Sequence, residues 1–252
     1  MVKIGNFFFH YRNGLFPLVY AIAVFKSPPV LTDYRIAALL GLLIALAGQL
    51  LRAITIGLEY IVRGGRNRQV YAEKLVTGGI FNHCRNPLYD GNLLIMLGVG
   101  VASNSIWFLG CAMPFFVFAY CAIVAAEENF LRNKFGQEFD DYCAKVSRWL
   151  PNFSGITATL SGMEFNWRRL ISAEYGSTFV WMLAVILLTL KNMWLNGDYQ
   201  INRTLVTTLW ALLGVVTLAY AIARFLKKSG RLNTDRAPAP AEAGESLSSA
   251  GN

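Results

Sequence analysis

Long apolar runs separated by short polar stretches dominate the hydrophobic pattern of this chain. We expect about six membrane segments, at residues 15–25, 34–51 with helix continuing to about 62, 88–102, 106–126, 177–195 and 205–226. A helix needs roughly 20 residues to cross about 30 Å of hydrocarbon, and it satisfies its own backbone hydrogen bonds there. The pattern therefore predicts an all-α, polytopic transmembrane helical bundle with short cytoplasmic helices, in which 88–102 and 106–126 form a helical hairpin.

The composition supports a membrane protein. Hydrophobic residues make up 55% of the chain and charged residues 15%, whereas a soluble domain carries about a quarter charged residues. This balance excludes a soluble enzyme, a disordered chain, a collagen and a disulfide scaffold, and the runs are too long and too uniformly apolar for barrel strands. The cysteines and histidines show no zinc-type spacing, so we expect reduced, structural thiols and no metal site.

The charge of the chain favours one orientation in the membrane. The net charge is +8. With six crossings, the side opposite the two termini keeps only these cations: Lys26, Arg35, Lys191 and Arg203. The positive-inside rule then predicts cytoplasmic termini and cytoplasmic loops at 59–90 and 127–176, in a bacterial inner membrane or the endoplasmic reticulum. We attribute the basic excess to topology and to anionic lipid headgroups, and we expect no nucleic-acid partner.

One face of the second segment carries small residues at three- and four-residue steps. Small residues let helices approach closely in lipid, and the steps here are occupied by Ala37, Gly41, Ala45 and Gly48. The same face continues with Arg52, Thr55 and Glu59. Two interpretations stay open for these polar residues: a buried ion pair or snorkelling side chain, and the polar wall of a site at the cytoplasmic boundary.

A polar stretch just before the third membrane segment gathers several reactive side chains. They are Lys74, His83, Arg85 and Tyr89. Asn86-Pro87 is typical of a helix start, with Asn86 as the N-cap. The third segment is short for a full crossing, so we expect residues 86–91 to lie below the membrane surface or in a cleft. We interpret His83 as a surface or capping residue rather than as a base.

A second polar stretch begins with the pair Glu127-Glu128. Neighbouring side chains on a helix point about 100° apart, so the two carboxylates meet different surroundings. Glu128 has Arg132 four residues on, which is a favourable pair. Glu127 shares its face with Tyr120 and Ile123, which look into the bundle. We therefore predict that Glu127 is the acid that faces a pocket.

The order of these motifs resembles a known family. Leu-Val-Thr-Gly-Gly-Ile-Phe at 75–81 is followed by Arg-Asn-Pro-Leu-Tyr-Asp-Gly at 85–91, a helical hairpin, Glu127-Glu128 and then Phe135-Gly136. This set, over about residues 37–154, looks like the superfamily of isoprenylcysteine carboxyl methyltransferases and phospholipid methyltransferases. These are integral-membrane enzymes that use S-adenosylmethionine, so the resemblance implies that cofactor for this chain.

The resemblance also implies which residues form the site. The family's cofactor contacts correspond here to Glu73, Lys74, Leu75, Val76, Phe81, Asn86, Pro87, Leu88, Tyr89 and Glu127. The residues predicted to carry the chemistry are Arg85, Tyr89, Glu127 and Glu128. Asn86 replaces a histidine of the carboxyl methyltransferases and agrees with the phospholipid N-methyltransferases. Ile123 replaces a substrate-contacting arginine of the carboxyl methyltransferases, which disfavours a prenylcysteine carboxylate as substrate.

These features predict an S-adenosylmethionine-dependent methyltransferase that acts on a lipophilic acceptor and contacts membrane lipids. The acceptor would be a prenylcysteine-like carboxylate, a phospholipid amine or another lipid-borne nucleophile, and it would arrive sideways between helices. Glu127 would bind the cofactor's ammonium or ribose, and Arg85 or Lys74 its carboxylate. An anionic acceptor needs no base, whereas an amine needs one, such as His83, Tyr89 or Glu128.

We divide the chain into an N-terminal membrane segment (1–36), a methyltransferase core (37–154), an additional two-span segment (155–228) and a disordered cytoplasmic tail (229–252). Two other functions stay open: an NADPH-dependent membrane isoprenoid or sterol reductase, and a non-catalytic scaffold or small transporter. The Glu127-Glu128 pair favours methyl transfer. No Gly-x-Gly-x-x-Gly follows a strand, so a Rossmann-type methyltransferase is excluded. The oligomeric state stays open.

Overall fold

The computed structural model describes residues 1–58, 70–162 and 164–232. Within these ranges the chain is helical and contains no β-strand, which confirms the all-α prediction. The elements are α1 (Val2–Tyr20), η1 (Ala21–Val24), α2 (Tyr34–Leu58), η2 (Gly79–Asn82), α3 (Pro87–Ser103), η3 (Phe108–Ala112), α4 (Met113–Phe135), α5 (Gln137–Lys145), α6 (Ile156–Ser161), α7 (Trp167–Leu195), α8 (Asp198–Ile201) and α9 (Arg203–Lys228). Glu59 and residues 233–252 of the expected tail lie outside the described residues.

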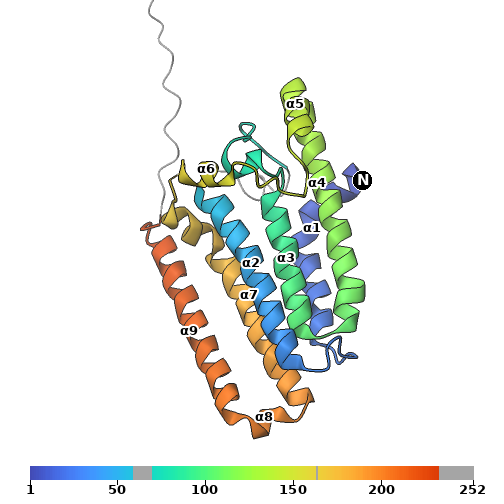
Figure 1. Cartoon of the computed structure of the whole chain (residues 1–252), viewed down its shortest axis with the longest axis vertical. Helices are drawn as coiled ribbons and strands as arrows, with labels where there is room; N and C mark the ends of the chain where they lie inside the picture. Colours follow the sequence, from blue (N-terminus) through green and yellow to red (C-terminus); the bar gives the residue numbers. More distant parts are fainter. Residues whose placement is uncertain (59–69, 163, 233–252) are drawn as a thin grey trace, which may run out of the picture.

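The long helices α1, α2, α3, α4, α7 and α9 run side by side in alternating directions (Figure 1). Helix α2 packs against α3, α1 packs against α4, and α7 contacts both α2 and α9. The short helix α5 extends past the end of α4, and α6 lies across the same end of the bundle. This end therefore gathers the start of α3 and the end of α4, where the sequence concentrates its reactive side chains.

Four helical stretches are long and apolar enough to cross a membrane: Tyr34–Leu58, Phe108–Phe135, Trp167–Leu195 and Arg203–Lys228. They indicate a multi-pass membrane protein, but the expectation of about six crossings is not confirmed. Helix α3 has 17 residues, about 25 Å of helix. The first segment also differs from the expectation, because the helix starts at Val2 instead of near residue 15.

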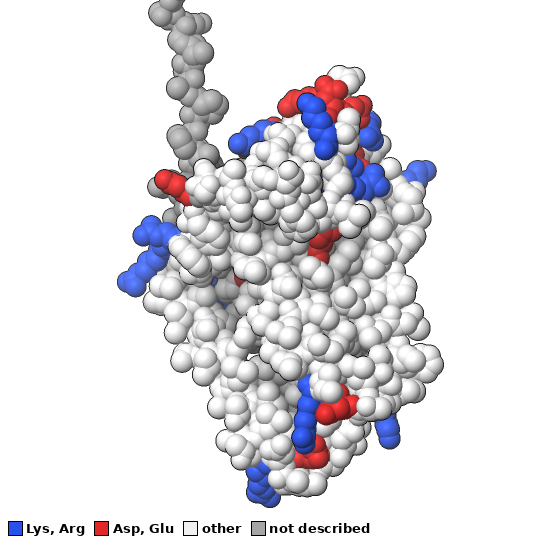
Figure 2. Space-filling model, viewed as in Figure 1, with Lys and Arg blue, Asp and Glu red and all other residues white. Residues whose placement is uncertain are grey.

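Charged side chains gather toward the two ends of the bundle and leave a mostly uncharged belt between them (Figure 2). Leu43 and Leu50 of α2, and Val215 and Leu218 of α9, are each more than half exposed within the described structure. An exposed apolar surface of this extent is unfavourable in water, whereas lipid tails are as apolar as leucine. The belt is therefore the surface that a bilayer would cover.

Helices α2 and α3 approach too closely for side chains to fit between them. A Cβ added at Gly48 would lie 2.7 Å from the carbonyl oxygen of Gly91, and one added at Gly98 would lie 2.5 Å from the amide nitrogen of Ala45. The small-residue face of α2 is buried in this contact, as its three- and four-residue steps predict. Close approach of this kind lets helices associate in lipid, and it fixes the start of α3 against α2.

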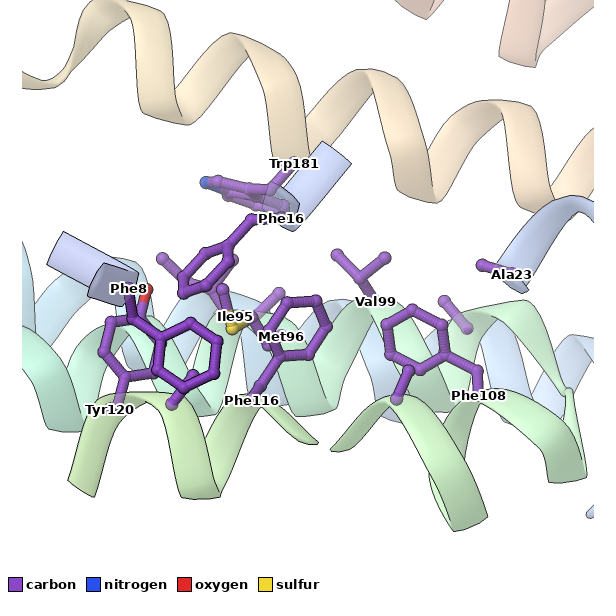
Figure 3. Packing of buried hydrophobic residues seen from close by; sticks show 14 of the residues in the cluster. Phe8, Phe16, Ala23, Ile95, Met96, Val99, Phe108, Phe116, Tyr120 and Trp181 are labelled. Carbon is purple, nitrogen blue, oxygen red and sulfur yellow. The ribbon is translucent and has the colours of Figure 1, made fainter. Parts of the chain in front are cut away.

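A second packing centre joins α1, α3, α4 and α7. Figure 3 shows the side chains of Phe16, Met96, Tyr120 and Trp181, one from each of these helices, in one buried cluster. The ring of Phe16 lies 5.5 Å from that of Tyr120, edge to face, which is a favourable aromatic geometry. This cluster holds α1 against α4, and α7 packs against α3, so the cluster determines the walls of the space between these helices.

Substituting Gly98 by alanine is expected to lower the unfolding temperature of the purified protein in detergent. The added methyl group would meet backbone atoms of α2, and overpacking of this kind costs about 1–3 kcal/mol. Gly214 on α9 is the matched control, since a Cβ there meets nothing within 4 Å and alanine favours helix. A Gly98→Ala protein as stable as Gly214→Ala would contradict the tight α2–α3 contact.

Candidate active site

A cavity of about 1310 Å³ lies between α1, α3, α4 and α7. Its lining runs along α1 from Arg12 to Tyr20, along the loop and helix from Arg85 to Val99, and along α7 from Ala173 to Lys191, and it includes Tyr120 and Glu127 of α4. Most of the lining is apolar, so each polar group in it needs a hydrogen-bond partner from the protein or from a bound molecule. The polar groups nearest the start of α3 define the candidate site.

Tyr89 and Glu127 meet at the wall of this cavity. Pro87 opens α3 at a position where no amide donor is needed, and this places Tyr89 in the first turn. The Tyr89 hydroxyl donates a hydrogen bond of 2.6 Å to Oε1 of Glu127, and its ring lies 5.2 Å from that of Tyr120. A carboxylate with this single described partner in a largely apolar cavity attracts a cation or further hydroxyl donors.

Glu128 has entirely different surroundings from its neighbour. Its carboxylate is buried and accepts from Arg85 Nη2 at 3.0 Å and from Arg148 Nε at 3.0 Å, and it does not line the cavity. The expected pair with Arg132 is wrong, because Arg132 Nε donates to Asp140 Oδ1 at 2.7 Å instead. The chain turns back into α5 at Gly136, whose φ is +55°, and this turn brings Asp140 to Arg132.

Arg85 ties the segment after α5 to the start of α3. Its Nη1 donates to the carbonyl oxygens of Cys143 at 3.0 Å and Val146 at 2.6 Å. The next residue but one is Pro87, so these bonds hold the turn that leads to Tyr89. Arg85 also lines the cavity, and its guanidinium is held in an ion pair with Glu128, which Arg148 shares.

The thiol and imidazole near this turn are occupied in structural contacts. Burial, followed by the hydrogen bond to Asp90, raises the pKa of the Cys84 thiol to about 12, so it stays protonated at neutral pH. The expectation that His83 lies at the surface is wrong: the ring is buried, with Nδ1 2.6 Å from the Asn152 carbonyl and Nε2 2.8 Å from Thr159 Oγ1. These contacts connect the loop to α6 and keep the imidazole out of the cavity lining.

The structure brings most of the predicted site residues together and leaves others apart. The cavity lining includes Phe81, Arg85, Asn86, Pro87, Leu88, Tyr89 and Glu127. Glu73 and Lys74 are exposed, and Leu75 packs against the buried cluster of α5 and Val146. Residues 73–76 and Glu128 therefore lie outside the lining. Ile123 is fully buried and is also absent from the lining.

Arg52 forms a buried ion pair and also lines the cavity, so both interpretations offered by the sequence apply to it. Its Nη2 lies 2.6 Å from Glu174 Oε1 in a buried ion pair, and its side chain also lines the cavity. Its Nη1 contacts Asn92 Oδ1. Glu174 belongs to α7 and was missed by the sequence reasoning. It is the single carboxylate of that helix, and an ionisable residue at membrane depth usually has a functional or structural partner, so this signal could have identified it.

Arg12 of α1 is a second lining residue that the sequence reasoning missed. Its guanidinium lies 4.2 Å from the centre of the Phe9 ring. No motif in the sequence connects residue 12 to residues 85–91 or to 127, so only the packing of α1 against α4 reveals it. Helices α1 and α7 together supply two of the four cavity walls.

The central part of the chain is similar to known proteins. Residues 36–138 match the phospholipid methyltransferase family. The nickel-cobalt-cadmium resistance protein NccN of Alcaligenes xylosoxydans xylosoxydans is 28% identical over 160 residues, which cover 60% of this chain and 70% of the relative. The cobalt-zinc-cadmium resistance protein CzcN of Cupriavidus metallidurans is 32% identical over 128 residues, 51% of this chain and 52% of the relative.

A plant relative carries the name of an enzyme. The probable protein-S-isoprenylcysteine O-methyltransferase of rice, Oryza sativa, is 29% identical over 131 residues, which cover 49% of this chain and 65% of the relative. The chain thus spans between about half and 70% of the length of these relatives. No solved structure matches the chain. All of α1 and all of α7 lie outside the family match.

Replacing Glu174 by glutamine is expected to lower the unfolding temperature strongly, because it leaves the buried Arg52 guanidinium without a counter-charge. Breaking a buried pair from one side costs about 3–5 kcal/mol. Asp140→Asn is the matched control, since both side chains of its pair with Arg132 are nearly half exposed and exposed pairs contribute little. Equal shifts for the two variants, measured by thermal unfolding in detergent, would contradict a structural role for the Arg52–Glu174 pair.

Proposed function

Because residues 36–138 match the phospholipid methyltransferase family and the rice relatives bear the name of an isoprenylcysteine methyltransferase, we propose that the chain transfers a methyl group from S-adenosylmethionine to a lipophilic acceptor. The acceptor would be a prenylcysteine-like carboxylate, a phospholipid amine or another lipid-borne nucleophile. The observation that carries this proposal is the hydrogen bond between Tyr89 and Glu127 at the wall of the cavity. It joins the two polar stretches on which the sequence prediction depends.

The cavity suits a cofactor of this size and chemistry. Its volume of about 1310 Å³ exceeds the roughly 300–1,000 Å³ of a typical small-molecule pocket, which leaves room for the head of an acceptor. Within the described ranges Tyr89 is the one residue that bonds the Glu127 carboxylate, so lone pairs remain for an ammonium or ribose hydroxyl. These features support the cofactor that the family implies.

When bound, S-adenosylmethionine would supply an electrophilic methyl group on a positively charged sulfur. Tyr89, Glu127 and the residues at the start of α3 would hold it, and it would give its methyl group to a lone pair of the acceptor, with the sulfur keeping the electron pair of the broken carbon–sulfur bond. The protein mainly has to align the reactants and exclude water. If the acceptor is an amine, the Tyr89–Glu127 pair is the proton-accepting group in reach of the cavity.

We assign the cofactor to the residues that line the cavity near the start of α3. These are Phe81, Asn86, Pro87, Leu88, Tyr89 and Glu127. Residues 73–76, which the resemblance also implies, are placed outside the lining, so we leave them out of this assignment. Lys74 is exposed, and Arg85 is matched by Glu128. We therefore assign neither the Arg85 guanidinium nor the Lys74 ammonium to the cofactor's carboxylate.

Arg85 and Glu128 act as positioning residues in this proposal. Glu128 accepts from Arg85 and from Arg148, and the Asn86 side chain donates to the Arg148 carbonyl at 3.1 Å. This network fixes the turn that carries Asn86 and Tyr89. A buried carboxylate held by two guanidinium groups is rigid, so it orients the site without touching the reacting atoms.

The acceptor would reach the site from the lipid, between α1 and α7. Val24 after α1 and Val180 on α7 both line the cavity, yet they are 66% and 63% exposed. A residue can line a cavity and remain exposed only where the cavity opens at the surface. These positions lie along the apolar belt of the bundle, so a lipid tail can occupy the opening at little cost in desolvation.

The test is transfer of labelled methyl from S-adenosylmethionine into a membrane lipid extract by the purified full chain, with the product identified by mass. Glu127→Gln is expected to lower the rate at least 100-fold, because it removes the charge that binds the cofactor. Glu138→Gln changes an exposed acid on α5 and should leave the rate unchanged. Full turnover by folded Glu127→Gln removes Glu127 from the site, and binding of NADPH without any methyl transfer would indicate a reductase.

A further inference from the structure

Arg12 differs from the other arginines of the cavity because no carboxylate among the described residues forms an ion pair with it. Arg52 is paired with Glu174, and Arg85 is paired with Glu128. Across residues 1–58, 70–162 and 164–232, Arg12 forms neither an ion pair nor a hydrogen bond, and its contact is with the face of the Phe9 ring. A guanidinium carries five donors, and here they are available to a bound molecule.

The charge of Arg12 acts on the reactive end of the cavity. It interacts electrostatically with Tyr89, Tyr120 and Glu127, and all four residues line the same cavity. Within the described structure Arg12 makes no ion pair with Glu127, so its guanidinium is not held by that carboxylate. An anionic group that enters the cavity beside Arg12, away from the Glu127 carboxylate, would be attracted to the guanidinium.

The helix face that begins with Arg12 continues as an apolar wall. Phe16 and Tyr20 follow at four-residue steps, so they lie on the same side of α1, and both line the cavity. Val24 extends this wall to the lateral opening. One helix face thus presents a cation at one end and an apolar surface beyond it, which matches a molecule with an anionic head and an apolar tail.

We propose that Arg12 binds the anionic head of the acceptor, so that the substrate is an acidic lipid with a carboxylate or phosphate head. This inference rests on the proposed function, since it names the substrate class of the same site. The cofactor is assigned to Phe81, to residues 86–89 at the start of α3 and to Glu127 of α4, whereas Arg12 heads the apolar wall of α1. The acceptor, not the cofactor's own carboxylate, therefore contacts this guanidinium.

The proposal predicts selective binding of anionic amphiphiles without any cofactor. The full chain in neutral detergent would be titrated with hexadecanoate, hexadecyl phosphate, hexadecanol and hexadecylamine, and binding followed by thermal shift and calorimetry. At least one anionic probe is expected to bind about tenfold more tightly than hexadecanol, because a hydrogen bond to a charged group is involved. The tighter of the two anions distinguishes a carboxylate from a phosphate head.

The variants separate Arg12 from other causes. Arg12→Gln is expected to lose the anionic preference, and Arg12→Lys to keep part of it, since lysine retains the charge but not the planar fork. Arg203→Gln, which changes an exposed arginine at the far end of the bundle, should keep it fully. The affinity for S-adenosylhomocysteine should stay within about twofold in Arg12→Gln.

Three results would overturn the assignment. They are equal binding of anionic and neutral probes by the wild-type chain, an unchanged preference in folded Arg12→Gln, and a loss of S-adenosylhomocysteine affinity in that variant. If labelled methyl transfer persists while the anionic preference is absent, the role of Arg12 fails and the proposed function stands. If no methyl transfer occurs, the proposed function fails whatever the probes show.

Discussion

The contact between α2 and α3 is the constraint on which the rest of the structure depends. Gly91 packs against Gly48 and the stem of Arg52, so this side of α3 must face α2. Two residues along a helix turn the side chain by about 200°. Tyr89 therefore faces away from α2, toward α4, where its hydroxyl meets Glu127. The position of the site thus follows from backbone packing that only small residues allow.

The adjacent carboxylates of Glu127 and Glu128 on α4 have different roles because the packing gives them different surroundings. Glu128 is buried and forms ion pairs with both Arg85 and Arg148. Glu127, one residue earlier, faces an apolar cavity and accepts from Tyr89. A charge that is fully paired in the protein contributes rigidity, whereas a charge with spare lone pairs in an apolar cavity attracts a ligand. The helical rotation between neighbours is enough to divide these roles.

Helices outside the family match complete the cavity. The match covers residues 36–138, yet α1 and α7 form two walls and supply Arg12, Glu174 and Trp181 to the cavity or its border. Trp181 Nε1 donates to Gln49 at 2.9 Å, so α7 is anchored on α2 by polar groups as well as by packing. The shared core therefore positions the Tyr89–Glu127 pair, and the added helices shape the space in which an acceptor would lie.

The sequence by itself determined the helical class, the hairpin of α3 and α4, the small-residue face of α2 and the choice of Glu127 over Glu128. These follow from local rules, because apolar run length, residue size and helical rotation act within one element. The partners of Arg132 and Glu128 and the burial of His83 were decided by tertiary structure. So were the contributions of Arg12 and Glu174, which come from helices with no motif to mark them. Their roles depend on which helices become neighbours. In lipid this is determined by how well helix surfaces pack, and because all these surfaces are similarly apolar, hydrophobicity alone does not predict the neighbours.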